Sequence, residues 1–171
     1  MAPTTPSTAS PLSTSLHATA LEFLHSCDCD PSQPTRLNHA RIHAIRAPGY
    51  THTFGPSYFV SVTPPLQGTL STDGFIAHME RMLPMLESWD TTVTDVCVDE
   101  ARRSVVVRAR YGMRVKGAEV EVQNDIVWWL WMAEDEGVVK VERSVEFVDG
   151  VASGRLKEVM GEMKAKAKEE A

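Results

Sequence analysis

The second half of the chain alternates between apolar and polar residues with the period typical of β-strands. The alternation predicts strands at about residues 90–98, 102–115, 118–132 and 137–147, joined by short turns at VDEARR, KG and AEDEG. Strands joined by such short turns pair as an antiparallel meander.

The first half instead spaces its apolar residues as a helix does. One helix is predicted to begin near Thr14, with Ser13 or Thr14 as its cap, and a second to cover about residues 36–45. A third helix is predicted in STDGFIAHMERMLPMLES, where Pro84 kinks or shortens the last turn. The segment between the second and third helices, GYTHTFGPSYFVSVTP, is predicted to be extended.

A final helix is predicted from about residue 151 to residue 168. Helices followed by a meander predict an α+β fold, in which a strongly curved antiparallel sheet wraps over the N-terminal helices as a cone with an apolar mouth. The 171 residues suffice for one domain, expected at 14–165. Residues 1–13, rich in Pro, Ser and Thr, are expected to be a disordered leader, and 166–171 a frayed polar tail.

Charge and composition exclude several classes of partner. The net charge of -6 argues against nucleic acid, and the basic residues between Arg102 and Lys116 alternate along a strand pair, as on a solvated face. The tryptophan-rich strand is too short to cross a membrane. The N-terminus lacks the features of a signal peptide, and Cys27, Cys29 and Cys97 are poorly spaced for disulfides. We therefore expect a cytoplasmic protein with reduced cysteines.

Alternation along 118–132 divides its side chains between two faces of the sheet. Asn124 falls on a face that is otherwise apolar, with Val122, Ile126, Trp128 and Leu130. Such a face suits a pocket wall in which Asn124 contacts a substrate oxygen, although an asparagine bridging backbone groups at a bulge fits equally. The opposite face carries Glu121, Gln123, Asp125, Val127, Trp129 and Trp131. Its two tryptophans need to be covered.

The last predicted strand ends in the carboxylates of EFVDG. A carboxylate among apolar residues has its pKa raised by desolvation, which suits Glu146 as a general acid or base. Alternation places Glu146 with the polar residues Lys140, Glu142 and Ser144, so only a pocket at the strand end would capture it. Asp149 serves equally well as the cap of the C-terminal helix.

Arg46 and His52 flank the turn RAPGYTH. Arg46 is either exposed or reaches the mouth of the cone to bind a carboxylate or enolate. His52 alternates with Tyr50 and Phe54, so it either faces a pocket, where it can transfer protons, or packs in the core with them. The histidines of HARIH lack a third ligand, and neither GxxxxGK nor GxSxG occurs, so neither a metal site nor covalent serine chemistry is expected.

These segments carry a resemblance to a known family. RAPGYTHTFGP, VQNDIVWWLWM and VEFVDG together resemble the SnoaL-like branch of the NTF2-like superfamily, closest to small fungal isomerases and cyclases of polyketide, meroterpenoid and indole-alkaloid biosynthesis. The resemblance spans about residues 16–163 and matches Arg46, Pro48, His52, Pro56, Asn124, Glu146, Phe147, Val148 and Asp149. The chain departs from the family at Gly49–Tyr50, at Asp125, and at Val122 and Ile126, where tyrosines often stand.

The resemblance implies a homodimer without cofactor or metal, whose cone holds a small hydrophobic substrate for isomerisation, cyclisation, dehydration or rearrangement. Glu146 or His52 would move a proton while Arg46 and Asn124 stabilise an oxyanion. The implied catalytic residues are Arg46, His52, Asn124, Glu146 and Asp149, and the substrate-binding residues are Tyr50, Phe54, Val122, Ile126 and Trp128.

Two other readings remain open. A dehydratase or epoxide hydrolase on the same cone would use Arg46 with Asp125 and Asp149, although alternation separates the two aspartates. A non-catalytic ligand-binding dimer would need no buried carboxylate. In each reading, we expect the loop from Ser57 to Gly68 to select the ligand.

Overall fold

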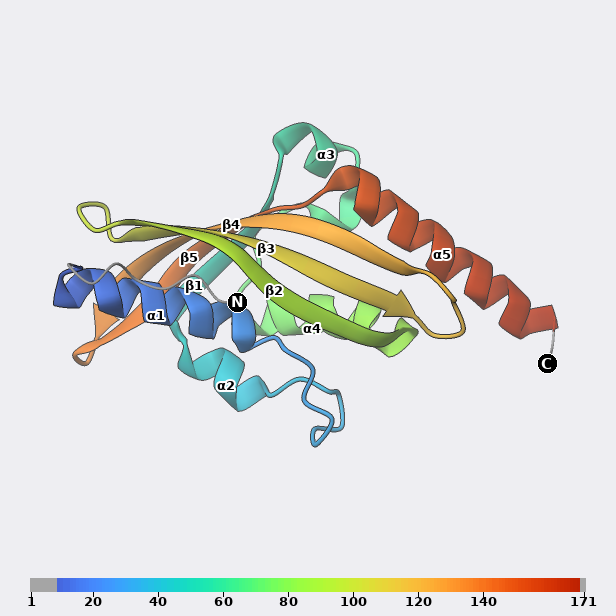
Figure 1. Ribbon diagram of the computed structural model, residues 1–171, viewed down its shortest axis with the longest axis horizontal. Helices are drawn as coiled ribbons and strands as arrows, with labels where there is room; N and C mark the ends of the chain where they lie inside the picture. Colours follow the sequence, from blue (N-terminus) through green and yellow to red (C-terminus); the bar gives the residue numbers. More distant parts are fainter. Residues whose placement is uncertain (1–8, 170–171) are drawn as a thin grey trace.

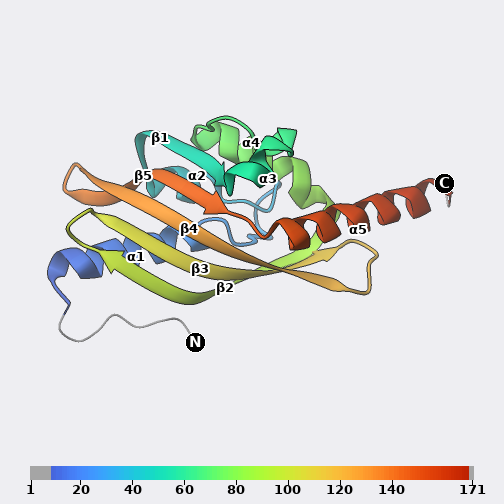
Figure 2. The same cartoon turned by 90° about the horizontal axis from the view of Figure 1, so that it is seen from above.

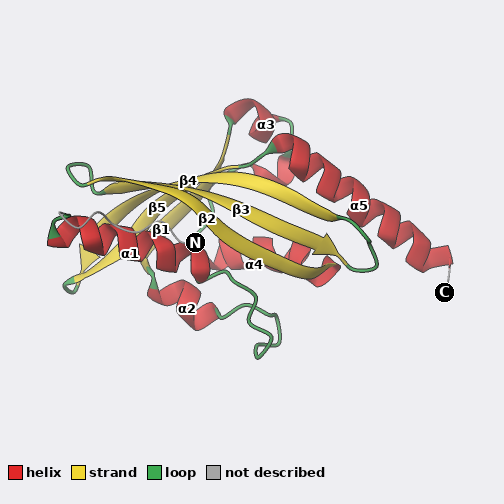
Figure 3. Cartoon of the chain, viewed as in Figure 1, coloured by secondary structure: helices red, strands yellow, loops and turns green. Residues whose placement is uncertain are grey.

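The computed structural model describes residues 9–169 and has the predicted α+β architecture. One five-stranded sheet has the order β1-β5-β4-β3-β2 (Figure 3). Its strands are β1 (Arg46–Gly55), β2 (Leu86–Asp99), β3 (Ser104–Val115), β4 (Glu121–Asp135) and β5 (Val138–Phe147). The α-helices are α1 (Pro11–His25), α2 (His39–Ala44), α3 (Ser57–Ser61), α4 (Thr72–Met82) and α5 (Gly150–Glu169).

The meander from β2 to β5 confirms the four predicted strands, with bounds that differ by a few residues. The prediction was incomplete at the N-terminal side, because the segment from Arg46 is not merely extended but joins the sheet as an edge strand. β1 lies parallel to β5, with His52 opposite Ser144 and Phe54 opposite Glu146. A parallel pair requires a long connection, and alternation along one segment does not reveal such a distant partner.

The helices differ from the prediction at several ends. Helix α1 begins at Pro11, before the predicted Thr14, because Ser10 accepts from the backbone N–H of Ser13 and caps it. Of the proposed leader, residues 1–8 lie outside the described residues. Helix α2 is shorter than predicted, since Asn38 caps it. The extended prediction was wrong after Gly55, where α3 forms.

Helix α4 is confirmed, with Ser71 as its cap, and Pro84 lies in the 3₁₀ turn that ends it. Helix α5 is continuous through Glu169, and the proposed fraying of the tail stays a prediction. Among the described residues, no helix is long and apolar enough to cross a membrane.

Helices α1, α2, α4 and α5 pack on the inner face of the curved sheet, where the core lies. Helix α1 packs across β2, β3 and β5, while α2 and α4 lie against β1 (Figures 1 and 2). Helix α5 packs on β3 and β4 and then projects beyond the sheet (Figure 1). The inner face of the sheet is therefore enclosed by α1, α2, α4 and α5, and the polar groups on it are largely shielded from water.

Candidate functional site

Strand β4 places its side chains as alternation predicts. Asn124 is 4% exposed and lies among buried apolar neighbours on the inner face. Asp125 lies on the outer face, where its carboxylate accepts a hydrogen bond from Arg108 Nε at 3.0 Å. That ion pair holds the pKa of Asp125 below its usual range. Asp125 is thus directed away from the interior.

A β-bulge in β5 directs Glu146 inward, against the simple alternation. Trp131 of β4 pairs with Arg143, but the next residue, Met132, pairs with Val141, so Glu142 is an extra residue in the ladder. A bulge of this kind exchanges the two faces of a strand beyond it. Val141 is buried before the bulge, and Ser144 and Glu146 are buried after it.

Strand β1 contributes its polar residues to the same interior. Gly49 has a φ of 77°, and the register with β5 shifts between Arg46 and Thr51. Beyond this irregularity Tyr50 and His52 both face Ser144. The Tyr50 hydroxyl lies 2.6 Å from Ser144 Oγ, and His52 Nδ1 lies 2.8 Å from the same oxygen.

His52 and Glu146 form the chemical centre of this cluster. Nε2 of His52 lies 3.6 Å from Oε2 of Glu146, and the imidazole is fully buried while the Glu146 side chain keeps 12% exposure. Burial raises the pKa of Glu146 to about 8. Burial, followed by the positive charges of Arg46 and His78, lowers the pKa of His52 to about 3. At neutral pH the pair is therefore a carboxylic acid facing a neutral imidazole.

Arg46 lies on the far side of Tyr50 and is buried rather than exposed. Its guanidinium packs over the rings of Phe23, Tyr50 and Phe75 at 4.4, 5.0 and 5.1 Å. Nη1 donates to the carbonyl oxygen of Ile42 at 2.8 Å. No described carboxylate lies within ion-pair distance of it, which leaves a buried cation available to an anionic or carbonyl group of a ligand.

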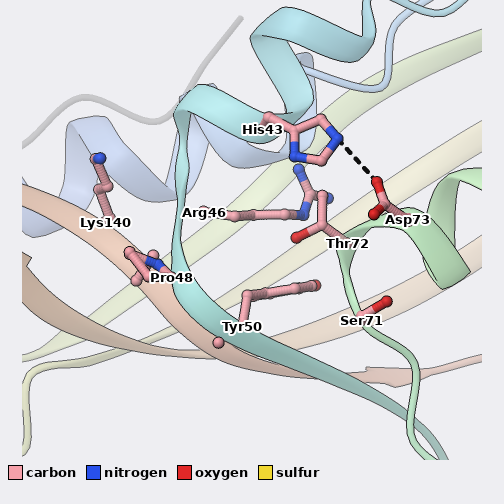
Figure 4. Close-up of a pocket in the computed structure, with 10 residues that line it drawn as sticks. His43, Arg46, Pro48, Tyr50, Ser71, Thr72, Asp73 and Lys140 are labelled. Carbon is pink, nitrogen blue, oxygen red and sulfur yellow. Dashed lines mark ion pairs between the residues drawn. The ribbon is translucent and has the colours of Figure 1, made fainter.

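A cavity of about 420 Å³ opens beside Arg46 (Figure 4). The bulge of β1 and the start of α4 form its walls, and an ion pair between His43 and Asp73 spans 3.1 Å at its edge. Arg46 and Tyr50 both line this cavity. A chain of contacting side chains thus connects this cavity with the His52–Glu146 pair. It runs through Arg46, Tyr50, Ser144, His52 and Glu146.

Asn124 lies toward α5 and opposite the buried phenol of Tyr111. Its Nδ2 donates to Ser153 Oγ at 3.3 Å. Tyr111 of β3 stands directly opposite Asn124 in the ladder, and its hydroxyl accepts from Trp128 Nε1 at 3.0 Å. Burial, together with the charge of Glu146, raises the pKa of Tyr111 well above its ordinary value. Tyr50 on β1 and Tyr111 on β3 therefore supply phenols to the interior from two strands that β5 and β4 separate. These phenols offset the loss of the tyrosines that the family often carries at Val122 and Ile126.

Unsatisfied polar atoms mark the site most sharply. In the described part of the chain, the buried side-chain atoms without a hydrogen-bond partner are Arg46 Nε, His52 Nε2 and Asn124 Oδ1. Buried polar atoms in folded proteins nearly always have partners, and each exception calls for an explanation. All of these atoms belong to residues that the sequence singled out, and a polar ligand would satisfy them.

The other predicted residues have separate positions. Asp149 caps α5, accepting from the backbone N–H of Val151 at 2.9 Å and of Ala152 at 3.1 Å. Phe54 is half-buried and presents its ring at 4.5 Å from that of His52. Val122, Ile126 and Trp128 are buried on the inner face of β4. Within residues 9–169 there is no cluster of His, Cys, Asp and Glu suited to a metal ion.

Sequence reasoning missed Ser144, Ser153 and Tyr111. Ser144 was grouped with the solvated residues of its strand, because the bulge that inverts the strand leaves no mark in the alternation. Its place two residues before Glu146 was the available signal, since residues i and i+2 of a strand share a face.

The fold matches solved structures of SnoaL-like and NTF2-like proteins. PrhC from Penicillium brasilianum superposes with a TM-score of 0.67 at 18% identity, over 90% of this chain and 93% of PrhC. The BvnE pinacolase from Penicillium brevicompactum gives 0.67 at 16% identity, over 88% and 94%. A candidate SnoaL-like polyketide cyclase from Jannaschia gives 0.64 at 18% identity, over 86% and 94%.

Neither a protein-family model nor a curated protein matches the chain. At these identities the structural likeness establishes the fold. The chain therefore has the SnoaL-like, NTF2-like fold that its motifs predict.

Proposed function

We propose that this protein is a cofactor-independent isomerase or cyclase that acts on a hydrophobic secondary-metabolite intermediate by general acid/base catalysis. The observation that carries the proposal is the set of unsatisfied polar atoms on Arg46, His52 and Asn124, enclosed in an apolar interior with a protonated Glu146. An apolar interior with a few convergent polar groups is typical of a small-molecule site.

Glu146 is the group best suited to move the proton. A carboxyl group with a pKa of about 8 exchanges its proton near neutral pH, where general acids and bases are most effective. Its residual exposure gives it a route to solvent or substrate. His52 stands beside it as a neutral imidazole, and Asn124 provides an amide on the α5 side.

Asn124 can present either of its amide atoms to a substrate. Ser153 Oγ both donates and accepts hydrogen bonds, so the amide orientation is set by the ligand rather than by this contact. Asn124 would stabilise a developing oxyanion with its NH₂ group. Arg46, at the other end of the cluster, would bind an oxygen-bearing part of the substrate beside the 420 Å³ cavity. Solved structures with this fold include one named as a pinacolase, which supports a rearrangement chemistry.

Mass spectrometry of a candidate pathway intermediate, incubated with pure protein and no added cofactor, tests the proposal. A new chromatographic peak of unchanged mass is expected. A gain or loss of water would instead indicate a hydrolase or dehydratase. A compound that binds and stays unaltered across a panel of polyketide and terpenoid intermediates would favour a ligand carrier and contradict the proposal.

The epoxide hydrolase alternative has little geometric support. It needs Asp125 beside Arg46, but Asp125 pairs with Arg108 on the outer face. Asp149, the second aspartate of that alternative, caps α5.

We also propose that the protein forms a homodimer through the outer face of the sheet. Trp129 and Trp131 stack there with ring centroids 4.7 Å apart, and Trp129 is 36% exposed. The register places further apolar residues beside them. This outer-face patch consists of Val106, Val127, Trp129, Trp131, Val145 and Phe147. A contiguous apolar patch of this kind commonly marks an association surface.

Trp129→Glu is expected to convert the dimer to a monomer, because a two-fold interface would bring two like charges together. Sedimentation equilibrium at micromolar concentration measures the change. Val151→Glu, which alters an 86% exposed apolar residue on α5, is the matched control and should stay dimeric. A monomeric wild-type protein would contradict this proposal.

A further inference from the structure

We propose that Ser144, together with Tyr50, holds His52 as the neutral tautomer protonated on Nε2. His52 then donates a hydrogen bond toward Glu146 and the substrate, and it does not itself move the proton. Ser144 is thereby a positioning residue. The donor role of His52 rests on the proposed function, whereas the tautomer itself does not.

The argument begins with the hydrogens available in the cluster. Tyr50, Ser144 and His52 are linked only through Ser144 Oγ, at 2.6 Å from the phenol and 2.8 Å from Nδ1. Each hydroxyl has one hydrogen, and a neutral imidazole has one N–H. All three groups are buried, so a hydrogen without an acceptor is costly.

One arrangement pairs both hydroxyl hydrogens. Tyr50 donates to Ser144 Oγ, Ser144 donates to Nδ1 of His52, and the imidazole hydrogen then resides on Nε2. That N–H has no partner within hydrogen-bond distance in the described chain, but it faces Oε2 of Glu146 at 3.6 Å.

The opposite tautomer satisfies the cluster less well. If Nδ1 carries the hydrogen and donates to Ser144, then Ser144 must donate to Tyr50, and the Tyr50 hydrogen has no acceptor among the described contacts. If Tyr50 also donates to Ser144, the Ser144 hydrogen loses its acceptor instead. Both versions leave a buried hydroxyl hydrogen with no acceptor near it. In the Nε2–H tautomer the one hydrogen left over is the imidazole N–H, which faces Oε2 of Glu146 at 3.6 Å.

The surroundings of His52 also oppose the imidazolium. Phe54 and Phe75 pack edge-on against its ring at 4.5 and 4.9 Å, and Trp128 lies at 5.8 Å. Arg46 and His78 are the basic groups that disfavour a positive charge here, and Glu146 is the facing acid. A neutral imidazole that donates from Nε2 can stabilise a substrate oxyanion without releasing a proton to it.

Nitrogen-15 NMR of the histidine side chains tests the tautomer without any substrate. His52, one of six histidines, is assigned by the signal that His52→Gln removes. We expect Nε2 to show the shift of a protonated nitrogen, and Nδ1 that of an unprotonated nitrogen accepting a hydrogen bond. Protonation on Nδ1, or on both nitrogens at neutral pH, would overturn the proposal.

Variants of the cluster test the role of Ser144. Ser144→Ala should remove the hydrogen-bond shift of Nδ1 and admit the second tautomer. Tyr50→Phe should leave Nδ1 unprotonated. Ser104→Ala is the control, because Ser104 is another buried serine of the sheet and its side chain makes no hydrogen bond to any residue between 9 and 169. An unchanged His52 spectrum in Ser144→Ala would overturn the positioning role.

Turnover by His52 variants shows whether His52 acts as a hydrogen-bond donor or as a base. Gln places an N–H donor near the position of Nε2 but cannot accept and return a proton, so His52→Gln should lose no more than about 10-fold in kcat, against about 10²- to 10³-fold for His52→Ala. Equal losses in two folded variants would show that His52 moves the proton. If no compound is turned over, the proposed function fails, while the NMR result still decides the tautomer.

Discussion

Glu146→Gln is expected to lower turnover by about 10²- to 10⁴-fold, because it removes the only carboxyl group that the bulge of β5 directs into the site. Gln has nearly the shape of the protonated carboxyl group, which is the form that burial favours. The substitution therefore removes the exchangeable proton while leaving packing and substrate binding largely unchanged.

Steady-state kinetics on the substrate identified by mass spectrometry measures this effect. The loss should appear in kcat with little change in KM, since the group acts in the transition state. Glu142→Gln, in the same strand but at the exposed bulge position, is the control and should retain full turnover. A Glu146→Gln enzyme with wild-type turnover would remove Glu146 from the mechanism.

Much of this fold follows from local patterns in the sequence. The alternation that locates β2 to β5 and the spacing that locates α1 and α4 arise from burial of one face, which each segment records by itself. The place of β1 depends on a partner about 90 residues away in the chain. The short helix α3 follows a proline that interrupts the strand pattern, and nothing in its apolar residues distinguishes it from an extended segment.

The site was predictable where alternation is regular and unpredictable where a bulge interrupts it. Asn124 and Asp125 fall on the faces that their positions in β4 predict. Glu146 is inward only because Glu142 is inserted into the ladder, and Ser144 is inward for the same reason. The burial of Arg46 among aromatic rings likewise depends on helices packed from elsewhere in the chain.

Titration of the buried pair should shape the stability of the protein between acid and alkaline pH. The raised pKa of Glu146 means that the folded state keeps a proton between pH 4.5 and about 8 that the unfolded chain releases, so stability falls as pH rises through this window. The lowered pKa of His52 acts oppositely, because between about pH 3 and 6.5 only the unfolded chain binds that proton. Stability should therefore rise to about pH 4.5, remain level to 6.5, and fall toward 8.

Glu146→Gln should remove the alkaline fall, because an amide has no proton to release. We expect the variant to gain about 2–3 kcal/mol in free energy of unfolding relative to wild type between about pH 5.5 and 8.5. Urea unfolding of both proteins at the two pH values measures this difference, and contributions from other titrating groups cancel in the comparison. Glu142→Gln should follow the wild-type curve. Parallel curves for wild type and Glu146→Gln would mean that the carboxyl group is ionised in the folded protein, and the neutral acid assigned to the site would then be wrong.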